Sequence, residues 1–379
     1  MQRAPISSLL FSALLYFGVY ASDNRPALAQ QHDSRTVEQP SRPHIAVLLP
    51  LKSTAVGRQA EALRLGILEA AKVHRGTTLP LVVRATGDDP FDVVQDYESA
   101  VRGGAQLVIG PLTRSAVTAL AGTTLVIVPT LALNAPEDES LIPQKLYVFG
   151  LQIENEARQV AQLARDRGRR NAIVVSTEAP LSHRLAQAFE DEFVRRGGTI
   201  QDQFQYSSAP AGLIKLRETI TNGVSDVIFL ALDSDRAKLV RSYLGTALPI
   251  YATSMVHTSA EPLANFELNG IYFVDMPWLL SPDHPAVLSY TRQEQLGLEF
   301  QRFYALGIDA YRIAQELLMP VPNQVPLDGV TGYITLEKDH RYIREVIPAQ
   351  FSQGETHVLS RPLSWLPPAT VAPRFRWAQ

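Results

Sequence analysis

The stretch Leu107-Val-Ile-Gly110-Pro111-Leu112-Thr113-Arg114-Ser115 decides the fold class of this chain. An apolar strand breaks at Gly110-Pro111 and continues into the polar first turn of a predicted helix. The first backbone N–H groups of such a helix have no partner within it, and the hydroxyls of Thr113 and Ser115 lie beside them at the sheet's carboxyl edge. The stretch therefore predicts a strand-to-helix turn that either binds a small polar molecule or only caps the helix.

Short apolar strands alternate with amphipathic helices on either side of this turn. In the helices apolar residues recur every three or four positions, as at Ala62, Leu65, Leu68 and Ala71. Such a series predicts a parallel sheet with helices on both faces. The expected strands cover 45–49, 79–85, 107–109 and 125–131, and the expected helices cover 58–73, 91–102 and 115–121.

The same alternation starts again after residue 150 and predicts a second α/β unit. No short sequence repeat links the two units, so their relation is architectural. The expected helices of the second unit cover 154–167, 182–196, 212–221 and 235–243, and its strands cover 172–176, 199–206, 226–231 and 249–252.

Late elements belong to neither series: a strand at 271–275, a helix at 299–318 and a hairpin through 332–336 and 342–347. They predict that the chain crosses between the units more than once, which creates a hinged cleft suited to ligands. The predicted fold class is thus α/β, with two doubly wound parallel-sheet lobes joined by a multi-crossing hinge. We expect lobe 1 to comprise 44–150 plus about 278–325, and lobe 2 to comprise 151–277 plus about 326–360.

The N-terminal segment predicts export of the protein. A basic Arg3, an apolar stretch over 6–21 and the small residues of Ala27-Leu28-Ala29 are typical of a secretory signal covering 1–29. An uncleaved membrane anchor is the alternative, and only then would the protein contact a membrane. The polar stretch 30–43 is predicted to be a flexible leader, and 361–379, with four prolines, an extended tail.

Composition excludes several kinds of function. With no cysteine, the chain has no disulfide, no lipid-modified cysteine, no thiolate catalysis and no zinc–thiolate site. A formal net charge of −3 gives no reason to expect nucleic acid, which requires many phosphate-neutralising cations.

Enzyme motifs are missing. The sequence has no Gly-x-Ser-x-Gly nucleophile elbow, no phosphate-binding Gly-x-x-x-x-Gly-Lys-Ser/Thr loop and no dinucleotide-binding Gly-x-Gly-x-x-Gly. The eight histidines are scattered, and none pairs with another at a spacing that would place two metal ligands on one helix face. We therefore predict no catalytic residue, no cofactor and no metal.

Polar residues after the strands are the candidates for the interlobe cleft. The hydroxyls and N–H groups after the first and third strands could hold the carboxylate of a small polar ligand, although each residue could equally cap a helix or shape a turn. Trp278, near a predicted crossing, either stacks on the ligand or packs under the hinge. The candidate residues are Ser53, Thr54, Gly110, Thr113, Ser115, Asn134 and Trp278.

Several carboxylates have structural explanations. Asp88-Asp89 precedes a predicted helix, where an N-cap is favoured over a cation site. Glu154 and Glu156 begin another helix, where negative charge complements the helix dipole. Asp309 lies within an apolar helix, and we expect it to be hydrogen-bonded across a packing interface rather than catalytic.

Eight short motifs in this order resemble the penicillin-binding protein activators of the LpoA/LppC type. Asp275-Met-Pro-Trp278 and Tyr304-Ala-Leu-Gly-Ile-Asp-Ala-Tyr311 are the most specific. The resemblance implies a type I periplasmic-binding-protein fold and a penicillin-binding protein as partner. The other motifs are His44–Leu51, Ile109–Leu112, Leu131–Asn134, Phe149–Leu151, Ala252–Ser254 and Gly329–Gly332.

The chain departs from that family in having no cysteine for a lipid anchor and only a short leader in place of a helical-repeat domain. Two functions follow as hypotheses. The first is a non-enzymatic periplasmic regulator of peptidoglycan synthesis that binds a penicillin-binding protein. The alternative is a receptor that delivers an amino acid or a similar small polar ligand to an ABC importer, and a hydrolase is a weaker third.

Overall fold

The structure, a computed structural model, describes residues 42–74, 79–138, 142–319 and 326–360. The expected signal segment, the leader up to residue 41 and the tail 361–379 lie outside them. Within the described ranges, every helix is too short or too polar to span a lipid bilayer.

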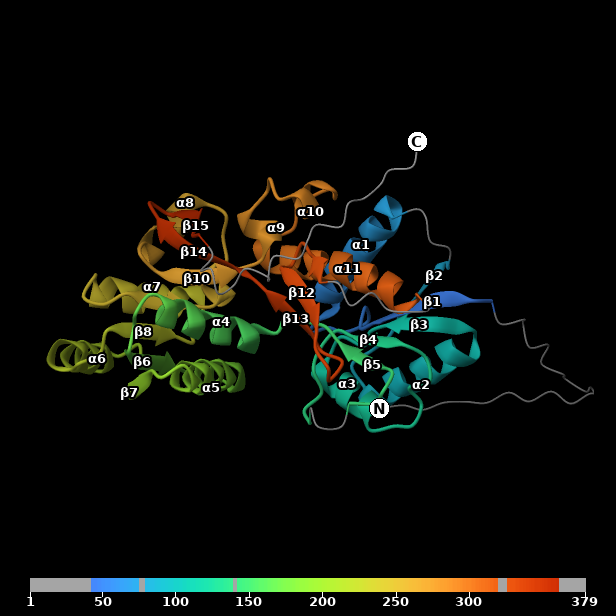
Figure 1. The fold of residues 1–379 in the computed structure, drawn as a ribbon, viewed down its shortest axis with the longest axis horizontal. Helices are drawn as coiled ribbons and strands as arrows, with labels where there is room; N and C mark the ends of the chain where they lie inside the picture. Colours follow the sequence, from blue (N-terminus) through green and yellow to red (C-terminus); the bar gives the residue numbers. More distant parts are fainter. Residues whose placement is uncertain (1–41, 75–78, 139–141, 320–325, 361–379) are drawn as a thin grey trace, which may run out of the picture. The chain divides into compact units, whose positions relative to one another are not determined.

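The first sheet is parallel, with strand order β2-β1-β3-β4-β5 (Figure 1). Side chains of β1 alternate between its faces: Ile45 and Val47 pack against α1 and α11, while Ala46 and Leu48 pack towards α2 and α3. Helices therefore cover both faces, as the sequence predicts. The bounds are β1 His44–Leu49, β2 Leu81–Ala85, β3 Ala105–Ile109, β4 Thr130–Ala132, β5 Leu146–Val148, α1 Gly57–Val73, α2 Pro90–Arg102, α3 Arg114–Ala121 and α11 Leu298–Leu317.

The second sheet repeats this order in its parallel part, β7-β6-β8-β9-β10, and adds the antiparallel strands β14 and β15. On β6, Ile173 and Val175 face the core with α6 and α7, whereas Ala172 and Val174 face the core with α4 and α5. The bounds are α4 Ile153–Asp166, β6 Asn171–Ser176, α5 Pro180–Arg195, β7 Thr199–Gln205, α6 Pro210–Asn222, β8 Val227–Leu230, α7 Ser234–Leu244, β9 Ile250–Ala252, β10 Tyr272–Asp275, β14 Ile347–Ser352 and β15 Glu355–Val358.

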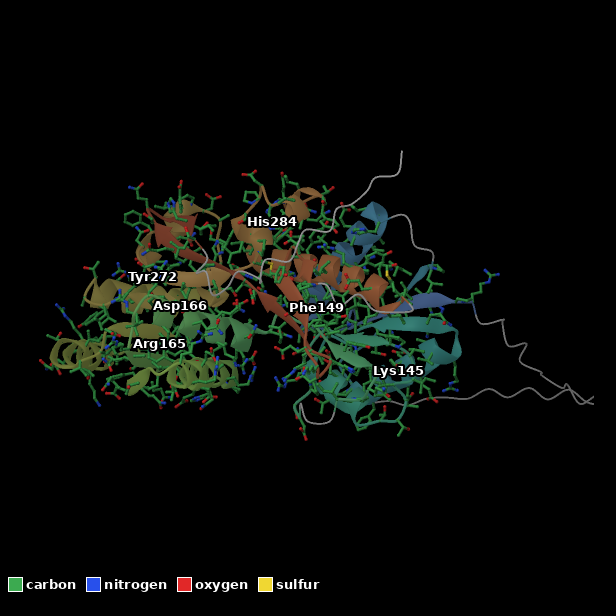
Figure 2. The ribbon with its side chains drawn as sticks, in the orientation of Figure 1. Lys145, Phe149, Arg165, Asp166, Tyr272 and His284 are labelled. Atoms are coloured by element: carbon green, nitrogen blue, oxygen red, sulfur yellow. The ribbon has the colours of Figure 1, made fainter. Side chains whose placement is uncertain are left out.

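The chain passes between the two sheets three times, which confirms the multi-crossing hinge. The first crossing follows Phe149, which comes directly after β5 and is labelled in Figure 2. The second crossing follows Asp275 at the end of β10, and the third is Val346. Val346 joins β14 to a small antiparallel sheet, β11-β12-β13. The remaining elements are η1 Ser254–Val256, α8 Pro262–Asn265, η2 Phe266–Leu268, α9 Pro277–Leu280, α10 Pro285–Leu288, β11 Leu327–Asp328, β12 Tyr333–Leu336 and β13 Tyr342–Glu345.

The small sheet corrects one expected boundary. Val330, Ile334 and Tyr342 pack in the same core cluster as β1, α1 and α11, so the segment before Val346 belongs with the first sheet. Only β14 and β15 join the second sheet. The other expected lobe boundaries stay predictions.

Two expected strands differ from the structure. The strand expected over 125–131 is reduced to β4, because Pro129 has no N–H to donate and pairing with β3 begins at Thr130. The strand expected over 342–347 is divided at Val346 between two sheets. The short strand β5 was not predicted, since three residues carry too little periodicity to be distinguished from a loop.

Helices α1 and α11 lie side by side, although they are far apart in the sequence (Figure 1). Two glycines allow this contact. A Cβ on Gly66 would overlap the carbonyl oxygen of Tyr304, and a Cβ on Gly307 would overlap that of Leu63. The backbones of the two helices therefore touch without side chains between them.

Candidate functional site

The carboxyl ends of β1 and β3 are adjacent, and the helices that follow them leave towards opposite faces of the sheet. In open α/β sheets this is the position at which ligands bind. The structure brings five of the predicted site residues to this edge. Ser53 is buried while Thr54 and Ser115 are exposed, and the other two are Gly110 and Thr113.

Two of these hydroxyls already have partners in the backbone. The Ser53 Oγ accepts hydrogen bonds from the N–H groups of Ala55 and Val56, at 3.1 and 3.0 Å. The Thr113 Oγ1 accepts from the N–H of Ala116 and caps α3. Both residues therefore shape the turns before their helices, which is the alternative weighed for each of them.

Gly110 is required by its backbone. Its φ is +110°, and a Cβ at this position would overlap the carbonyl oxygen of Leu48 on the neighbouring strand. The close approach of β1 and β3 at the edge depends on this glycine.

The two remaining candidates lie elsewhere. Asn134 donates from Nδ2 to the carbonyl of Leu112 at 3.3 Å, and it lines a cavity between the lobes. Trp278 has no exposed surface; its Nε1 donates to Oε1 of Gln301 at 2.7 Å, and its ring packs against Tyr304. The structure thus places Trp278 in the first core, under the hinge, and not on a cleft wall.

The interlobe cavity has a volume of about 530 Å³. Its walls come from the start of α3, the loops after β4 and β5, the flanks of α4 and α5, and the β12–β13 turn. Seven of its sixteen lining residues are charged: the arginines Arg114, Arg158, Arg184 and Arg341 and the carboxylates Glu154, Asp191 and Glu337.

Within the cavity, Glu154 accepts a hydrogen bond from Nε of Arg184 at 2.7 Å. Burial alone would raise the pKa of Glu154, but Arg184 and the charge of Arg114 lower it below its ordinary value. The pair joins α4 to α5. Glu154 therefore has a contact with Arg184 in addition to the favourable interaction with the helix dipole that was expected from the sequence.

A buried ion pair lies beside the first and third crossings. Arg344 on β13 donates to Oε1 of Glu156 on α4 at 2.8 Å, and to the carbonyls of Gly150 and Thr331. The second oxygen of Glu156 accepts from the N–H of Ser254 at 3.2 Å. Burial raises the pKa of Glu156, partly offset by Arg344.

The second crossing carries its own charged cluster. Arg302 on α11 donates to Asp275 at 2.6 Å and to the carbonyls of Ser254 and His257, which lie in the second lobe. The Nδ1 of His257 is 2.9 Å from the same carboxylate. Burial would raise the pKa of Asp275, but Arg302 and His257 together lower it to about 2.

Side-chain amides of Gln152, which directly precedes α4, and of Gln159 within α4 complete these contacts. Gln159 donates to the carbonyl of Arg344 at 3.0 Å and accepts from the N–H of Val346 at 2.9 Å. Gln152 donates to the carbonyl of Tyr342 at 2.9 Å. Hydrogen bonds from side-chain amides to the backbone therefore hold the third crossing against α4, in addition to the ion pair between Arg344 and Glu156.

The other carboxylates have the structural roles expected of them. Asp89 caps α2 by accepting from the N–H of Phe91 at 2.8 Å. Asp309 accepts from the N–H groups of Val330 and Thr331, from the Thr331 hydroxyl and from Arg312, across the interface between α11 and the loop after β11.

The described residues contain no group of three or more His, Asp or Glu side chains arranged to hold a metal ion. His257, the one histidine that contacts a buried carboxylate in these ranges, is itself nearly buried and sits in the hinge cluster. The chemistry that the site offers is ionic and hydrogen-bonded recognition.

Sequence reasoning missed the arginines of the cavity and of the hinge. Arg344 had a readable signal, because a charge in the middle of the apolar strand Tyr342–Ile347 must be paired if it is buried. The arginines of the cavity had none, since helical surface arginines are common and only the fold brings them together.

One protein family and several curated proteins are similar to this chain in sequence. The family model described as "LppC putative lipoprotein" matches residues 28–354. The penicillin-binding protein activator LpoA of Pectobacterium parmentieri is 24% identical over 335 residues, covering 76% of this chain and 49% of that protein. LpoA of Photobacterium profundum is 26% identical over 351 residues, covering 82% and 56%. The chain spans about half the length of these curated relatives.

Solved structures share the fold. A structure titled "putative branched-chain amino acid ABC transporter" from Chromobacterium violaceum ATCC 12472 is 36% identical, with a TM-score of 0.70, and covers 82% of this chain and all of that one. The LpoA C-domain from Haemophilus influenzae, titled a regulator of PBP1A, is 22% identical with a TM-score of 0.69, covering 84% and 100%.

These likenesses confirm the type I periplasmic-binding-protein fold predicted from the sequence. The family model spans the first sheet, the second sheet except β15, all three crossings and the interlobe cavity. This chain belongs to the LppC family.

Proposed function

We propose that this protein is a periplasmic activator of a penicillin-binding protein and acts by binding that synthase rather than by catalysis. The observation that carries the proposal is membership of the LppC family, together with relatives that are named penicillin-binding protein activators. Since those relatives are about twice as long, the activity and the partner are transferred here as a proposal.

The contacts at the hinge support the proposal that this protein is a regulator. A receptor of this fold closes on its ligand by bending at the crossings. Here Arg344 ties the crossings to Glu156, and Arg302 ties α11 to the second lobe, both in buried surroundings. Separating buried ion pairs costs several kcal/mol. A body held in this way offers a partner a fixed surface.

The experiment is reconstitution with purified components. The full chain is added to each bifunctional penicillin-binding protein of its own organism, and glycan polymerisation and peptide crosslinking are measured. We expect a saturable rate increase with one synthase, and binding to the same synthase in biolayer interferometry. An amino-acid receptor of the same fold is the control. Absence of both binding and acceleration with every synthase would refute the proposal.

A second function is favoured by one observation, the 36% identity to the Chromobacterium violaceum structure titled as an amino acid ABC transporter. A receptor would be stabilised by its solute, by about 2.7 kcal/mol at a hundredfold excess over Kd. A thermal-shift series with the branched-chain amino acids tests this. Saturable stabilisation by leucine, with no synthase bound, would favour the receptor over the activator.

A further inference from the structure

Arginines gather where α4 and α5 end, beside the amino ends of β6 and β7. Arg165 and Asp166, labelled in Figure 2, are the last two residues of α4, whereas the interlobe cavity is lined by the first half of that helix. The two loops are joined, because Arg165 donates from Nε to the carbonyl of Arg196 at 3.2 Å and the N–H of Thr199 donates to the carbonyl of Arg170 at 2.8 Å. The arginine cluster comprises Arg165, Arg167, Arg169, Arg170, Arg195 and Arg196.

Carboxylates neutralise only part of the charge of the arginine cluster. Six arginines and three carboxylates lie at this end of the second lobe, although the whole chain has a formal net charge of −3. Glu192 pairs with Arg195 and Arg196, both at 2.6 Å. Asp226 binds backbone N–H groups of the α4–β6 loop, and the third carboxylate is Asp166. On the two flanking elements the exposed charges are balanced between cations and carboxylates: Lys215 and Arg217 against Asp202 and Glu218.

Contacts within the protein hold several of these guanidinium groups in place. The Arg167 guanidinium lies over the ring of Tyr272, 4.7 Å from its centroid, and that of Arg165 lies 5.6 Å from the centroid of the Phe193 ring. Arg165 also donates to the carbonyl of Arg169. Side chains that are already ordered lose less conformational entropy when a partner binds. Ordered planar guanidinium groups match the carboxylates of a protein segment, whereas an anionic lipid surface selects only for charge.

Two exposed valines flank the arginine cluster. Val194, 53% exposed, directly precedes Arg195. Val224, 71% exposed, lies two residues before Asp226, whose carboxylate accepts from the N–H of Arg170. Arginine is enriched in protein interfaces, where it is combined with apolar contacts. The surface therefore has the composition of a site for a protein partner of negative charge.

We infer that the arginine cluster is the surface at which this protein binds an acidic segment of its penicillin-binding protein. The inference rests on the proposed function and names the surface that performs it. Arg167 and Arg170 are exposed and form no ion pair in the described part of the chain, so each can donate two parallel hydrogen bonds to a carboxylate of the partner. Val194 and Val224 contact apolar side chains of the same segment. Opposite charges also speed the association of the two proteins.

The test is binding of the full chain to the synthase that it accelerates, measured by biolayer interferometry at about 0.05, 0.15 and 0.5 M NaCl. A double variant, Arg167→Gln with Arg170→Gln, should weaken binding by about tenfold or more, because two charged contacts are lost. The affinity of the unchanged chain should fall as salt rises, and that of the double variant should fall less steeply, since fewer charges are screened.

The control is an arginine on the first lobe. Arg102 lies on α2 with its side chain 72% exposed, and Arg102→Gln should leave the affinity for the synthase unchanged. Circular dichroism and the melting temperature establish that each variant is folded. An equal loss of affinity in Arg102→Gln and in the double variant would overturn the inference, because the effect would then come from net charge alone.

The outcomes separate this inference from the proposed function. Equal synthase affinity in the double variant and the unchanged chain would overturn the inference and leave the proposed function intact, since the synthase is still bound. Binding to phosphatidylglycerol vesicles that the double variant alone loses would then assign the arginine cluster to a membrane surface. Absence of binding to every synthase would refute the proposed function and this inference with it.

Discussion

Arg344 and Glu156 form an ion pair of 2.8 Å whose side chains are only 1% and 3% exposed. They belong to β13, which packs with the first core, and to α4, which covers the second sheet. Desolvation makes such a pair costly to bury, but once it is buried, removing one partner leaves an uncompensated charge. The pair therefore fixes how the crossings join the two sheets more than it adds to the free energy of unfolding.

The first prediction is a double-mutant cycle on this pair. Arg344→Met should lower the free energy of unfolding by about 3–5 kcal/mol, because Glu156 loses its counter-charge. Adding Glu156→Gln to that variant should restore part of the loss. Urea unfolding measures all four proteins. If Arg344→Met costs less than about 1 kcal/mol, the pair does not hold the crossings.

The matched control is a surface pair. Arg102 and Glu98 are 2.9 Å apart on α2, with side chains 72% and 43% exposed. Arg102→Met should change stability by no more than about 0.5 kcal/mol. An equal loss in both arginine variants would mean that burial at the hinge has no special effect.

The second prediction concerns acid. The pKa of Asp275 is lowered to about 2 from an ordinary value of 3.8, so its ionised form favours the folded state. This contribution, on the order of 2 kcal/mol, is present above pH 4 and is lost as pH falls towards 2. The raised pKa of Glu156 acts in the opposite sense, since its contribution is lost as pH rises.

Urea unfolding of the unchanged chain and of Asp275→Asn at pH 6, 4 and 2.5 measures this. The stability gap between the two proteins should narrow below pH 4. Glu192, whose pKa is also about 2 despite burial because Arg195 and Arg196 bind it, titrates in the same window. Glu192→Gln is the parallel variant, and a gap for Asp275→Asn that stays constant with pH would contradict the assignment.

The third prediction concerns the helix contact. Alanine is intrinsically about 1 kcal/mol better than glycine within a helix, but a Cβ on Gly66 would overlap the backbone of Tyr304. We expect Gly66→Ala to destabilise the protein by at least about 1 kcal/mol, as overpacking against a backbone cannot relax by rotation. Gly87→Ala, which has open space around it, is the control in the same thermal melts. Stabilisation by Gly66→Ala would show that α1 and α11 can separate freely.

The fourth prediction separates packing from ligand contact at Trp278. Trp278→Phe removes the hydrogen bond to Gln301 and leaves a cavity in the first core. Stability should fall by about 1–3 kcal/mol. Any stabilisation by the branched-chain amino acids in the thermal-shift series should not change, because the ring does not line the interlobe cavity. A selective loss of binding at unchanged stability would return Trp278 to the cleft wall.

Apolar periodicity explains how much of this fold the sequence could predict. The helices expected at 154–167 and 299–318 lie within one residue of α4 and α11. Both depend on local patterns that a single segment contains. β5 and the division at Val346 depend instead on which sheet a short strand joins, and that is decided by residues far away in the sequence.

The candidate site shows the same limit. The turns at Ser53 and Thr113 could be placed at one sheet edge because the α/β alternation predicts parallel strands, whose carboxyl ends lie at the same edge. Whether their hydroxyls are free to bind a ligand could not be predicted, since a helix cap and a ligand contact use the same residue types. Arg114 and Arg158 approach one another only when the lobes are assembled, and no local pattern encodes that.

The glycine contact between α1 and α11 also bears on the order in which the chain can fold. The chain is synthesised from its N-terminus, so α1 is made long before α11. Leu63 and Ile67 on α1 therefore remain uncovered until every strand of the second sheet except β14 and β15 has been made and α11 follows. The first core is thus completed only after most of the second sheet has been made, although its strands come first. A product that stops before Leu298 would expose this apolar face and aggregate.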